Sequence, residues 1–513
     1  MTLRYRMTKL EFTKKLAQSI GLSSLILVMN YGDLLGGGSD VRMHVPFSLV
    51  GICLAQMADI LILAALIFIG LVGLKQTRYY PIVRLALAIT LPWYLIERLR
   101  GEIPFAVTGT LIIGMIVWGV VLVTMLRKFP QWYRFAIRGG NAAGVFLAVF
   151  AIVSFIQLGF VMRWKPGPYQ NHAAWATTPQ PPRAHKKVVW ILFDELSYDQ
   201  VFAHRAHDLP LPNFDALRSQ STLFTNTQPI GFKTVKIVPS LLIGQTIDDY
   251  HFSFRNRMWV HNLGEGDFHP ITGEDTIFGD AKKQGWRTGA VGWYNPYCTI
   301  YGDAIDDCYW MNLDRIDGNM SQRASFWSNT YEPLKQVVRE VKAPERADRD
   351  TCTYDVRQRL KTALDLQQHA YAMLNDDQAD FVFLHMPIPH SPNIWSRIED
   401  NYTTFCDSSY LDNLALADKV LGRMMQILQN SPRWKDTTVI VEGDHSWRTW
   451  IWENLPAWSD EDDAAARRGF DPRPAMIIHQ PGQTKPLTND RPWSILNVHE
   501  VLEQIVHGQP LTY

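Results

Sequence analysis

The sequence has no excess of charge of either sign and few cysteines. Lys and Arg together number 50, as do Asp and Glu, so no net positive charge points to a nucleic-acid partner. Only five cysteines are present, and none has the CxxC spacing of a zinc knuckle. At 513 residues the chain exceeds what one ordinary core takes up, so we expect two or more domains.

The few cysteines are unevenly placed along the chain. Cys53 lies in an apolar run, where a small buried residue is the simple interpretation. The other four lie in the polar C-terminal part: Cys298, Cys308, Cys352 and Cys406. An even number there fits an oxidising compartment, and the short intervening loop favours Cys298–Cys308 as a pair. Free buried thiols are the equal alternative, because the distance and orientation of the two cysteines decide whether a disulfide forms, and the sequence does not give them.

Long apolar runs fill the first 164 residues, whereas the rest resembles an ordinary soluble protein. Four runs are long enough to cross the hydrocarbon core, which needs ~20 helical residues; they are Leu49–Leu74, Ile82–Ile96 (the shortest), Phe105–Leu126 and Ala142–Val161. A weaker run, Leu16–Leu35, precedes them and contains Asp33 near its end. No small-residue cleavage site follows it, so we expect an anchor and not a removed signal peptide.

Basic residues set the predicted orientation. The N-terminal segment carries Arg4, Arg6, Lys9, Lys14 and Lys15, and the connections Lys75–Arg84 and Arg127–Arg138 are also basic. Basic connections stay cytoplasmic, and with five spans these three segments share one side. The connections Gly36–Val45 and Arg98–Pro104 then face the other side, and everything after Trp164 lies outside the cytoplasm. Four spans are the alternative, which would put the basic N-terminus outside or the soluble domain inside.

The segment that follows the apolar runs is rich in proline and polar residues. We expect residues 165–186 to form an extended tether and residues 187–513 to form one domain. The domain opens with Val188–Phe193, a continuous apolar run typical of a buried central strand of a parallel sheet. It ends in Asp194 and Glu195, where open α/β sheets place their ligands. A helix N-cap is the simpler alternative for this pair.

Two further predicted strands end in groups that can bind a metal. Thr437–Val441 leads into Asp444 and His445, a carboxylate and an imidazole that together suit Zn²⁺ or Mn²⁺. The strand Phe381–Leu384 leads into His385 and His390 on a proline-rich loop. These two could bind a metal, phosphate oxygens or a leaving group, or could be structural histidines.

A candidate nucleophile lies between these strands. A turn at Gly231 is followed by Thr234 and by a helix-like stretch that ends at Gly244. A metal-bound hydroxyl has a lowered pKa and yields the alkoxide that nucleophilic catalysis at neutral pH requires. Lys233 and Lys236 flank this threonine and could neutralise phosphate charge. A surface threonine between two lysines is the alternative interpretation.

These segments, in this order, resemble the alkaline phosphatase superfamily, in particular its sulfatase-like branch. That branch includes sulfatases, lipid A phosphoethanolamine transferases and lipoteichoic acid synthases. The resemblance covers roughly Lys187–Gln509 and rests also on the segments Asp280–Cys298, Tyr410–Gly422 and Pro474–Gly482. It implies an α/β domain whose mostly parallel central sheet is sandwiched by helices, joined to a transmembrane helix bundle of about five spans.

The resemblance also implies roles for individual residues. The modified cysteine of sulfatases falls on Thr234, which excludes formylglycine chemistry. The phosphoethanolamine transferases use threonine with a proline five places later, as at Pro239, and the lipoteichoic acid synthases use threonine preceded by lysine, as at Lys233. The metal, Zn²⁺ before Mn²⁺, would be held by Asp194 or Glu195, Thr234, Asp444 and His445. His390 would contact the transferred group or the leaving oxygen.

Three departures from the transferase pattern leave the transferred group open. The chain has Phe193-Asp194-Glu195 where the transferases usually have Gly-Glu-Ser, and no cysteine lies near the nucleophile. After the Asp-His pair it reads Ser446-Trp447-Arg448, where the transferases continue Gly-Glu-Ser.

The expected function is a metal-dependent transferase in a bacterial-type inner membrane, with a cytoplasmic N-terminus and a periplasmic catalytic domain. It would move phosphoethanolamine or phosphoglycerol from a membrane lipid, through a phospho-threonine, to an envelope glycolipid, glycan or polymer. A hydrolase that acts on phosphodiesters or sulfate esters with the same groups is the alternative. A non-catalytic scaffold is the third reading.

Overall fold

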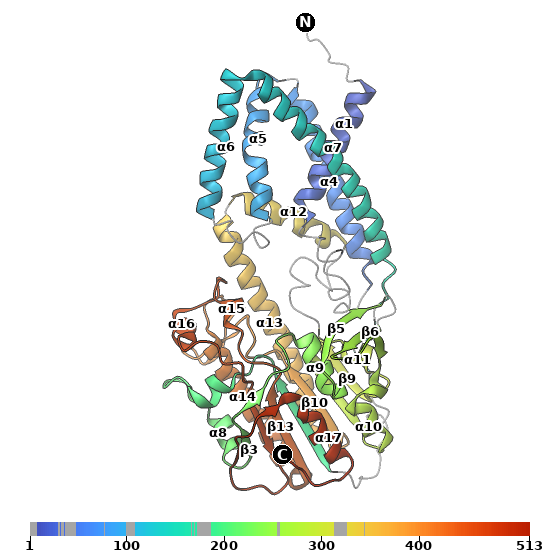
Figure 1. The fold of residues 1–513 in the computed structure, drawn as a ribbon, viewed down its shortest axis with the longest axis vertical. Helices are drawn as coiled ribbons and strands as arrows, with labels where there is room; N and C mark the ends of the chain where they lie inside the picture. Colours follow the sequence, from blue (N-terminus) through green and yellow to red (C-terminus); the bar gives the residue numbers. More distant parts are fainter. Residues whose placement is uncertain are drawn as a thin grey trace. The chain divides into compact units, whose positions relative to one another are not determined.

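The computed structural model describes residues 8–28, 31, 35, 48–75, 77–98, 108–165, 167–168, 170–171, 186–253, 257–311, 326–342 and 344–513. The chain divides into two compact units. The helical unit comprises α1, α4 to α7 and α12, and the α/β unit comprises the remaining described elements (Figure 1). Helix α12 (Phe326–Lys342) belongs to the helical unit although it lies far along the sequence, within the range predicted for the second domain.

Five long helices begin the helical unit: α1 (Lys9–Ile26), α4 (Val50–Lys75), α5 (Tyr80–Arg98), α6 (Thr108–Lys128) and α7 (Pro130–Val161). Among the described helices, α4 and α7 are long and apolar enough to cross a membrane. Two such helices are compatible with a membrane anchor, but they do not confirm five spans, which stay a prediction. Asp33, Gly36–Val45 and most of Arg98–Pro104 lie outside the described residues.

Close contacts fix the relative directions of these helices. Gln18 donates to the carbonyl oxygen of Asn141 at 3.0 Å, and a Cβ on Gly21 would lie 2.6 Å from the carbonyl oxygen of Gly144. These contacts advance together along both chains, so α1 and α7 are parallel, and small residues allow their close approach. Lys15 at the start of α1 donates to the carbonyl oxygen of Leu71 near the end of α4, so these two helices are antiparallel.

The helical unit exposes many apolar side chains and buries several polar ones. Leu61, Leu66 and Ile69 of α4 are exposed, whereas Gln56 and Asp59 of the same helix are fully buried. Ser19 and Ser23 of α1 are buried as well. This distribution is the reverse of a water-soluble helix and is typical of helices that contact lipid.

The α/β unit is built on a nine-stranded sheet. Across the sheet the strands follow the order β1 (Gln170–Asn171), β9 (Asp307–Met311), β8 (Thr288–Trp293), β10 (Phe381–Met386), β2 (Lys187–Phe193), β13 (Thr437–Gly443), β14 (Met476–His479), β3 (Thr222–Phe224) and β15 (Leu487–Asn489). The central strands β9, β8, β10, β2 and β13 are all parallel to their neighbours in this set. The three strands predicted from sequence are therefore confirmed, and they are adjacent.

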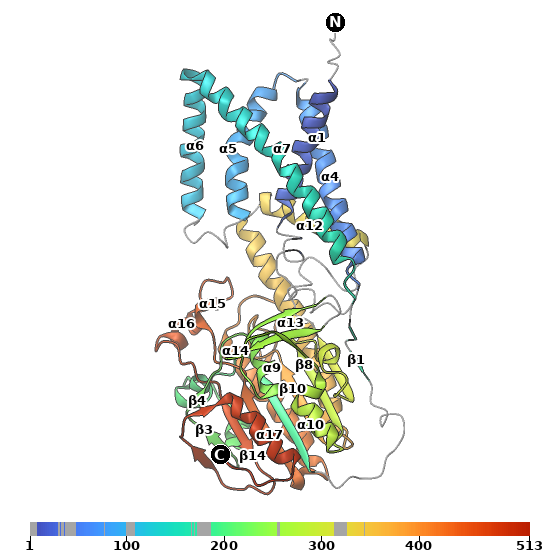
Figure 2. The same cartoon turned by 45° about the vertical axis from the view of Figure 1, so that its right-hand side comes forward.

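Helices cover both faces of this sheet (Figures 1 and 2). Val189, Ile191 and Phe193 of β2 point into the main core, which contains side chains from α8 (Pro212–Arg218), α13 (Pro344–Asn375) and α14 (Tyr410–Asn430). Trp190 points to the opposite face, where its ring lies 4.6 Å from that of Phe383. The elements on that face include α9 (Thr234–Ile243), α10 (Ile277–Lys283) and α17 (Val498–Val506). The mostly parallel sheet between helix layers is the predicted architecture.

Smaller elements complete the α/β unit. They are the sheet of β5 (Ile247–Phe252), β6 (Met258–Asn262) and β7 (His269–Ile271), the pairs β11 (Trp395–Ser396) with β12 (Asn401–Tyr402) and β4 (Thr227–Gln228) with β16 (Trp493–Ser494), and the helices α11 (Tyr297–Ile300), α15 (Thr449–Trp452) and α16 (Asp460–Ala466).

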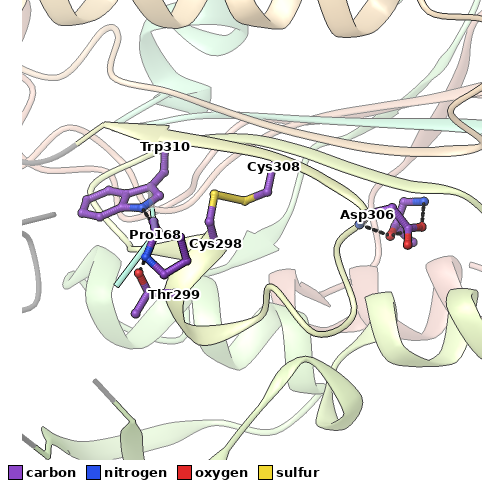
Figure 3. The surroundings of a disulfide bond; sticks show 7 residues. Pro168, Cys298, Thr299, Asp306, Cys308 and Trp310 are labelled. Atoms are coloured by element: carbon purple, nitrogen blue, oxygen red, sulfur yellow. Dashed lines mark hydrogen bonds between the residues drawn. A yellow bond between two sulfur atoms is a disulfide. The ribbon is translucent and has the colours of Figure 1, made fainter. Parts of the chain in front are cut away.

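Both cysteine pairs of the α/β unit form disulfides, Cys298–Cys308 and Cys352–Cys406. Around the first, Thr299 and Trp310 both donate to the carbonyl oxygen of Pro168, at 2.9 and 3.1 Å (Figure 3). Strand β1 pairs with β9 beside them. The beginning of the predicted tether is therefore fixed to the edge of the sheet, while residues 172–185 lie outside the described part.

Candidate metal centre

Neighbouring parallel strands deliver polar side chains to one edge of the sheet. Asp194 follows β2, Asp444 and His445 follow β13, and the loop after β10 carries His390. The carboxyl ends of parallel strands meet at this edge, which is where open α/β sheets bind ligands. Asp194, Asp444 and His445 are fully buried, and each offers one ligand atom within 4.8 Å of the others. Nε2 of His445 lies 3.3 Å from Asp444 Oδ2 and 3.8 Å from Asp194 Oδ1.

The structure also brings Thr234 to this group. Its Oγ1 donates to Asp444 Oδ2 at 2.8 Å and lies 3.5 Å from both Asp194 Oδ2 and His445 Nε2. Thr234 is the first residue of α9, whose unpaired N–H groups and dipole favour negative charge. At the other end, Gly244 has φ +72°, and a Cβ there would lie 2.5 Å from the His499 ring, so α9 needs glycine to end there.

The buried residues fit a divalent cation. Burial, and next the neighbouring Asp444 carboxylate, raise the pKa of Asp194 well above its usual value. Asp194 Oδ1 has no hydrogen-bond partner within the described structure. Two buried carboxylates beside an imidazole are costly without a compensating charge, and this donor set suits Zn²⁺ or Mn²⁺.

Glu195, the alternative metal ligand, is directed elsewhere. Its backbone has φ +66°, which is uncommon for a residue with a side chain. Its Oε1 accepts from Arg448 Nε at 2.6 Å, and both carboxylate oxygens accept from Trp452 Nε1 at 3.0 Å. Its N–H donates to Asp444 Oδ1 at 3.1 Å. Glu195 thus holds the residues after the Asp-His pair, while Asp194 faces the metal-binding group.

Arg448 is a site residue that the sequence analysis did not single out. Besides its contact with Glu195, it donates from Nη1 to the carbonyl oxygen of Phe232 at 2.9 Å, two residues before Thr234. It therefore links the loop after β13 to the loop that carries the hydroxyl. The departure Ser446-Trp447-Arg448 from the transferase pattern was the one available signal.

His390 is held between aromatic rings. Its ring centroid lies 5.2 Å from that of Trp293 and 5.0 Å from that of Trp452. Its backbone N–H donates to the Asp194 carbonyl oxygen at 3.1 Å. Burial, then the charges of Arg359 and Arg448, lower its pKa well below the usual value. Its Nδ1 contacts the carbonyl oxygen of Ser391. A neutral ring that donates from Nδ1 to this carbonyl keeps Nε2 as an acceptor.

The other predicted site residues lie around this group. His385 is fully buried, with Nε2 3.8 Å from Asp194 Oδ2 and Nδ1 2.7 Å from the Tyr297 hydroxyl. Burial lowers the pKa of His385 to about 4, so it is neutral at neutral pH. Lys236 donates to the backbone carbonyl of Asp248 on β5, and Lys233 is exposed. Arg448 and Arg359, not these lysines, are the cations beside the buried histidine and the Thr234 loop.

Comparisons with known proteins give one family match and several similar structures. The family model described as Sulfatase matches residues 186–450. Similar structures include the lipoteichoic acid synthase LtaP from Listeria monocytogenes, at 14% identity and TM-score 0.39, covering 63% of this chain and 72% of that one. The phosphonate monoester hydrolase of Agrobacterium radiobacter has 14% identity and TM-score 0.38, covering 63% and 74%. The PsFucS1 sulfatase from Pseudoalteromonas sp. has 12% identity and TM-score 0.42, covering 66% and 70%.

No curated protein sequence matches the chain. The family match spans more than half of the 513 residues and includes Asp194, Thr234, Asp444 and His445. The chain belongs to the Sulfatase family, whose members are metal-dependent enzymes, either hydrolases or transferases.

Proposed function

We propose that this protein is a membrane-anchored transferase that moves a phospholipid head group through a covalent phospho-threonine. The observation that carries the proposal is the position of Thr234 Oγ1, within 3.5 Å of Asp194, Asp444 and His445 at the N-terminus of a helix. A hydroxyl in this position can attack the phosphorus of an anionic phosphodiester, and a cation held by the neighbouring carboxylates and imidazole would compensate the charge. The transferred group would be phosphoethanolamine or phosphoglycerol.

In the first half-reaction, Thr234 Oγ forms a bond to phosphorus as the phosphorus–oxygen bond to diacylglycerol breaks. The hydroxyl proton passes to Asp444 Oδ2, to which it already donates, and the departing diacylglycerol oxygen takes up a proton from solvent to leave as the alcohol. Asp194, Asp444, His445 and Thr234 would hold the metal. When bound, a Zn²⁺ or Mn²⁺ ion would lower the pKa of the hydroxyl and offset the charge of the phosphoryl oxygens.

In the second half-reaction, an acceptor hydroxyl attacks the phospho-threonine. Nε2 of His390 can accept the proton of that hydroxyl, because its Nδ1 faces the Ser391 carbonyl. The Trp293 and Trp452 rings pack against the imidazole on either side and keep it in place. The new phosphorus–oxygen bond forms to the acceptor as the bond to Thr234 breaks, and the Thr234 oxygen takes back the proton that Asp444 received, which restores the hydroxyl.

The helical unit supports a lipid donor and an envelope acceptor. Because α1 and α7 are parallel and α4 is antiparallel to α1, the start of α1 and the end of α7 lie at opposite ends of the bundle, as an odd number of spans requires. Five spans with the basic segments in the cytoplasm satisfy this arrangement and place the α/β unit outside. An anchored enzyme meets its donor in the same membrane, and its acceptor would be a glycolipid, glycan or polymer.

Transfer and hydrolysis can be separated in one assay. The full chain in lipid vesicles is given phospholipid with a labelled head group, with and without acceptor glycolipid. We expect label to move to the acceptor with Thr234→Ser weakly active and Thr234→Ala inactive. If Thr234→Ala transfers label at the wild-type rate, the threonine mechanism is wrong.

The alternative is a hydrolase that uses the same threonine and metal with water as the acceptor. The match to the sulfatase family favours this reading, because the covalent intermediate serves both outcomes. Sustained turnover of aryl phosphodiesters or aryl sulfates in water, at rates above head-group transfer, would favour hydrolysis.

A further inference from the structure

Helix α12 returns to the helical unit from the middle of the α/β sequence. It lies between β9 and α13 along the chain, and it packs against α4. In both views it runs across the direction of the long helices, at the end of the bundle where α1 ends and not where it begins (Figures 1 and 2). With the proposed orientation this is the extracytoplasmic end.

The two faces of α12 are reversed relative to a helix on a soluble protein. Trp327, Tyr331 and Val338 are 74%, 61% and 52% exposed. Their spacings of four and seven positions place them on one face of the helix. Asn329 and Thr330, which point away from that face, are only 5% exposed. Among its side chains that the structure describes, α12 buries Asn329 and Thr330 together with Pro333 and exposes two aromatic rings and a valine.

A bilayer surface explains this reversal, and water does not. In water an amphipathic helix buries its apolar stripe. Trp and Tyr are enriched at the membrane–water interface, where an apolar ring and a polar edge are both satisfied. Lys335 Nζ lies 5.4 Å from the Tyr331 ring centroid, so an ammonium group accompanies the ring, as expected for a side chain that reaches the lipid phosphates.

We propose that α12 is an interfacial helix that lies in the head-group layer of the extracytoplasmic leaflet, with Trp327 and Tyr331 in contact with lipid. This inference rests on the proposed membrane anchoring. Since a single residue separates the end of α12 from the start of α13, the chain would connect the α/β unit to that leaflet at a second point besides the end of α7. The exposed face therefore has one occupant, a phospholipid bilayer.

The test uses a fluorescent label at single cysteines of the full chain in nanodiscs. Cys53 is replaced by Ala, and an environment-sensitive dye is attached at Trp327→Cys. Two positions of similar exposure serve as controls, Ile152→Cys on α7 and Leu487→Cys on β15. Spin-labelled lipids carry the quencher at the head group, at a shallow acyl position or at a deep one.

We expect head-group and shallow quenchers to reduce the Trp327 signal severalfold more than the deep quencher does. Ile152 should respond most to the deep quencher, and Leu487 to none. A Trp327 dye that behaves like the Leu487 dye overturns the proposal. So does a blue-shifted dye that no lipid quencher reaches, since protein would then cover the face.

An activity measurement keeps this inference separate from the proposed function. Trp327→Glu with Tyr331→Glu should raise the KM for bilayer phospholipid about tenfold or more and leave turnover of a soluble aryl phosphodiester unchanged. An unchanged KM for bilayer lipid contradicts a role of α12 at the membrane. If wild-type protein transfers no head group at all, the proposed function fails while the quenching result still decides where α12 lies.

Discussion

The two units of this chain follow one burial rule in opposite directions. In the α/β unit, β2, β10 and β13 are buried along their whole length, and β2 and β10 are mostly apolar. In the helical unit, α4 exposes leucine and isoleucine while it buries Gln56 and Asp59. In the α/β unit apolar groups leave water by packing into the core, and we propose that in the helical unit they leave water by facing lipid. The comparison teaches that exposure alone does not identify a surface: the solvent must be inferred from which side chains are exposed.

The largest expected difference is in the loss of turnover when a buried polar side chain is replaced in one unit or in the other. Thr234→Ala should reduce turnover by on the order of 10³-fold or more, because it removes the nucleophile. Asp59→Asn, at a buried polar position of α4, should leave turnover of a soluble aryl phosphodiester within about twofold. Steady-state kinetics on the full chain in detergent would check both. Equal losses would mean that the chemistry is not confined to the α/β unit.

Metal removal sharpens the same contrast. A strong chelator should lower activity by about 100-fold or more, since Asp194 and Asp444 are left as buried carboxylates without their cation. The helical circular-dichroism signal of the chain should change little, because the long helices of the helical unit supply none of the proposed metal ligands. Added Zn²⁺ or Mn²⁺ should restore turnover. Full activity in protein shown by elemental analysis to be metal-free would contradict the assignment.

Disulfides stabilise one unit only. Replacing Cys352 and Cys406 together by serine should lower the free energy of unfolding of the α/β unit by about 2–4 kcal/mol, because a long loop is released. Cys53 is the only cysteine in the first 164 residues, and Cys53→Ser is the matched control. Denaturation followed by tryptophan emission would give both values. A larger effect from the Cys53 variant would reverse the comparison.

Two exposed positions separate the solvents directly. Ile152 of α7 and Leu487 of β15 are 59% and 57% exposed. Ile152→Arg should cost up to about 2.5–3.5 kcal/mol of membrane insertion if that side chain faces lipid. Leu487→Arg faces water and should stay within about 0.5 kcal/mol of wild-type stability. The membrane-inserted fraction of each variant is the measurement, and equal behaviour would contradict the proposed anchor.

The smallest expected effect is at the water-facing surface of the α/β unit. His261 Nδ1 and Asp248 Oδ1 lie 2.5 Å apart, and the hydrogen bond between these side chains raises the pKa of His261 and lowers that of Asp248. The contribution of His261 is full below its unfolded pKa and is lost as pH rises through the raised folded value. The melting temperature of His261→Gln should therefore differ slightly from wild type at pH 6 and not at pH 9. A difference that grows with pH would contradict the pairing.

Local sequence patterns predicted the elements that carry the site. The run Val188–Phe193 has no polar residue, so only a buried strand satisfies it, and the structure places it in the sheet centre. Gly244 ends α9 because the positive φ there suits glycine. The same reasoning placed Thr234, Asp444 and His445 at element ends, where the parallel sheet brings them together.

Other features depend on contacts between distant segments and were not predicted. The direction of the Glu195 side chain follows from Arg448 and Trp452, more than 250 residues away. The attachment of β1 to β9 depends on an unpaired sheet edge that no local pattern shows. Helix α12 has an apolar face that, from sequence, would be expected to pack into a core. The structure shows instead that α12 packs against α4 with another side and leaves this apolar face exposed.

The central claim is that Thr234 becomes covalently attached to the phosphoryl group it transfers. Rapid acid quench of the full chain with phospholipid donor, followed by peptide mass spectrometry, tests it directly. The account predicts one modified peptide, increased by the mass of the head-group phosphoryl and modified on Thr234. Donor turnover with no adduct on Thr234, or with an adduct on another residue, would contradict it.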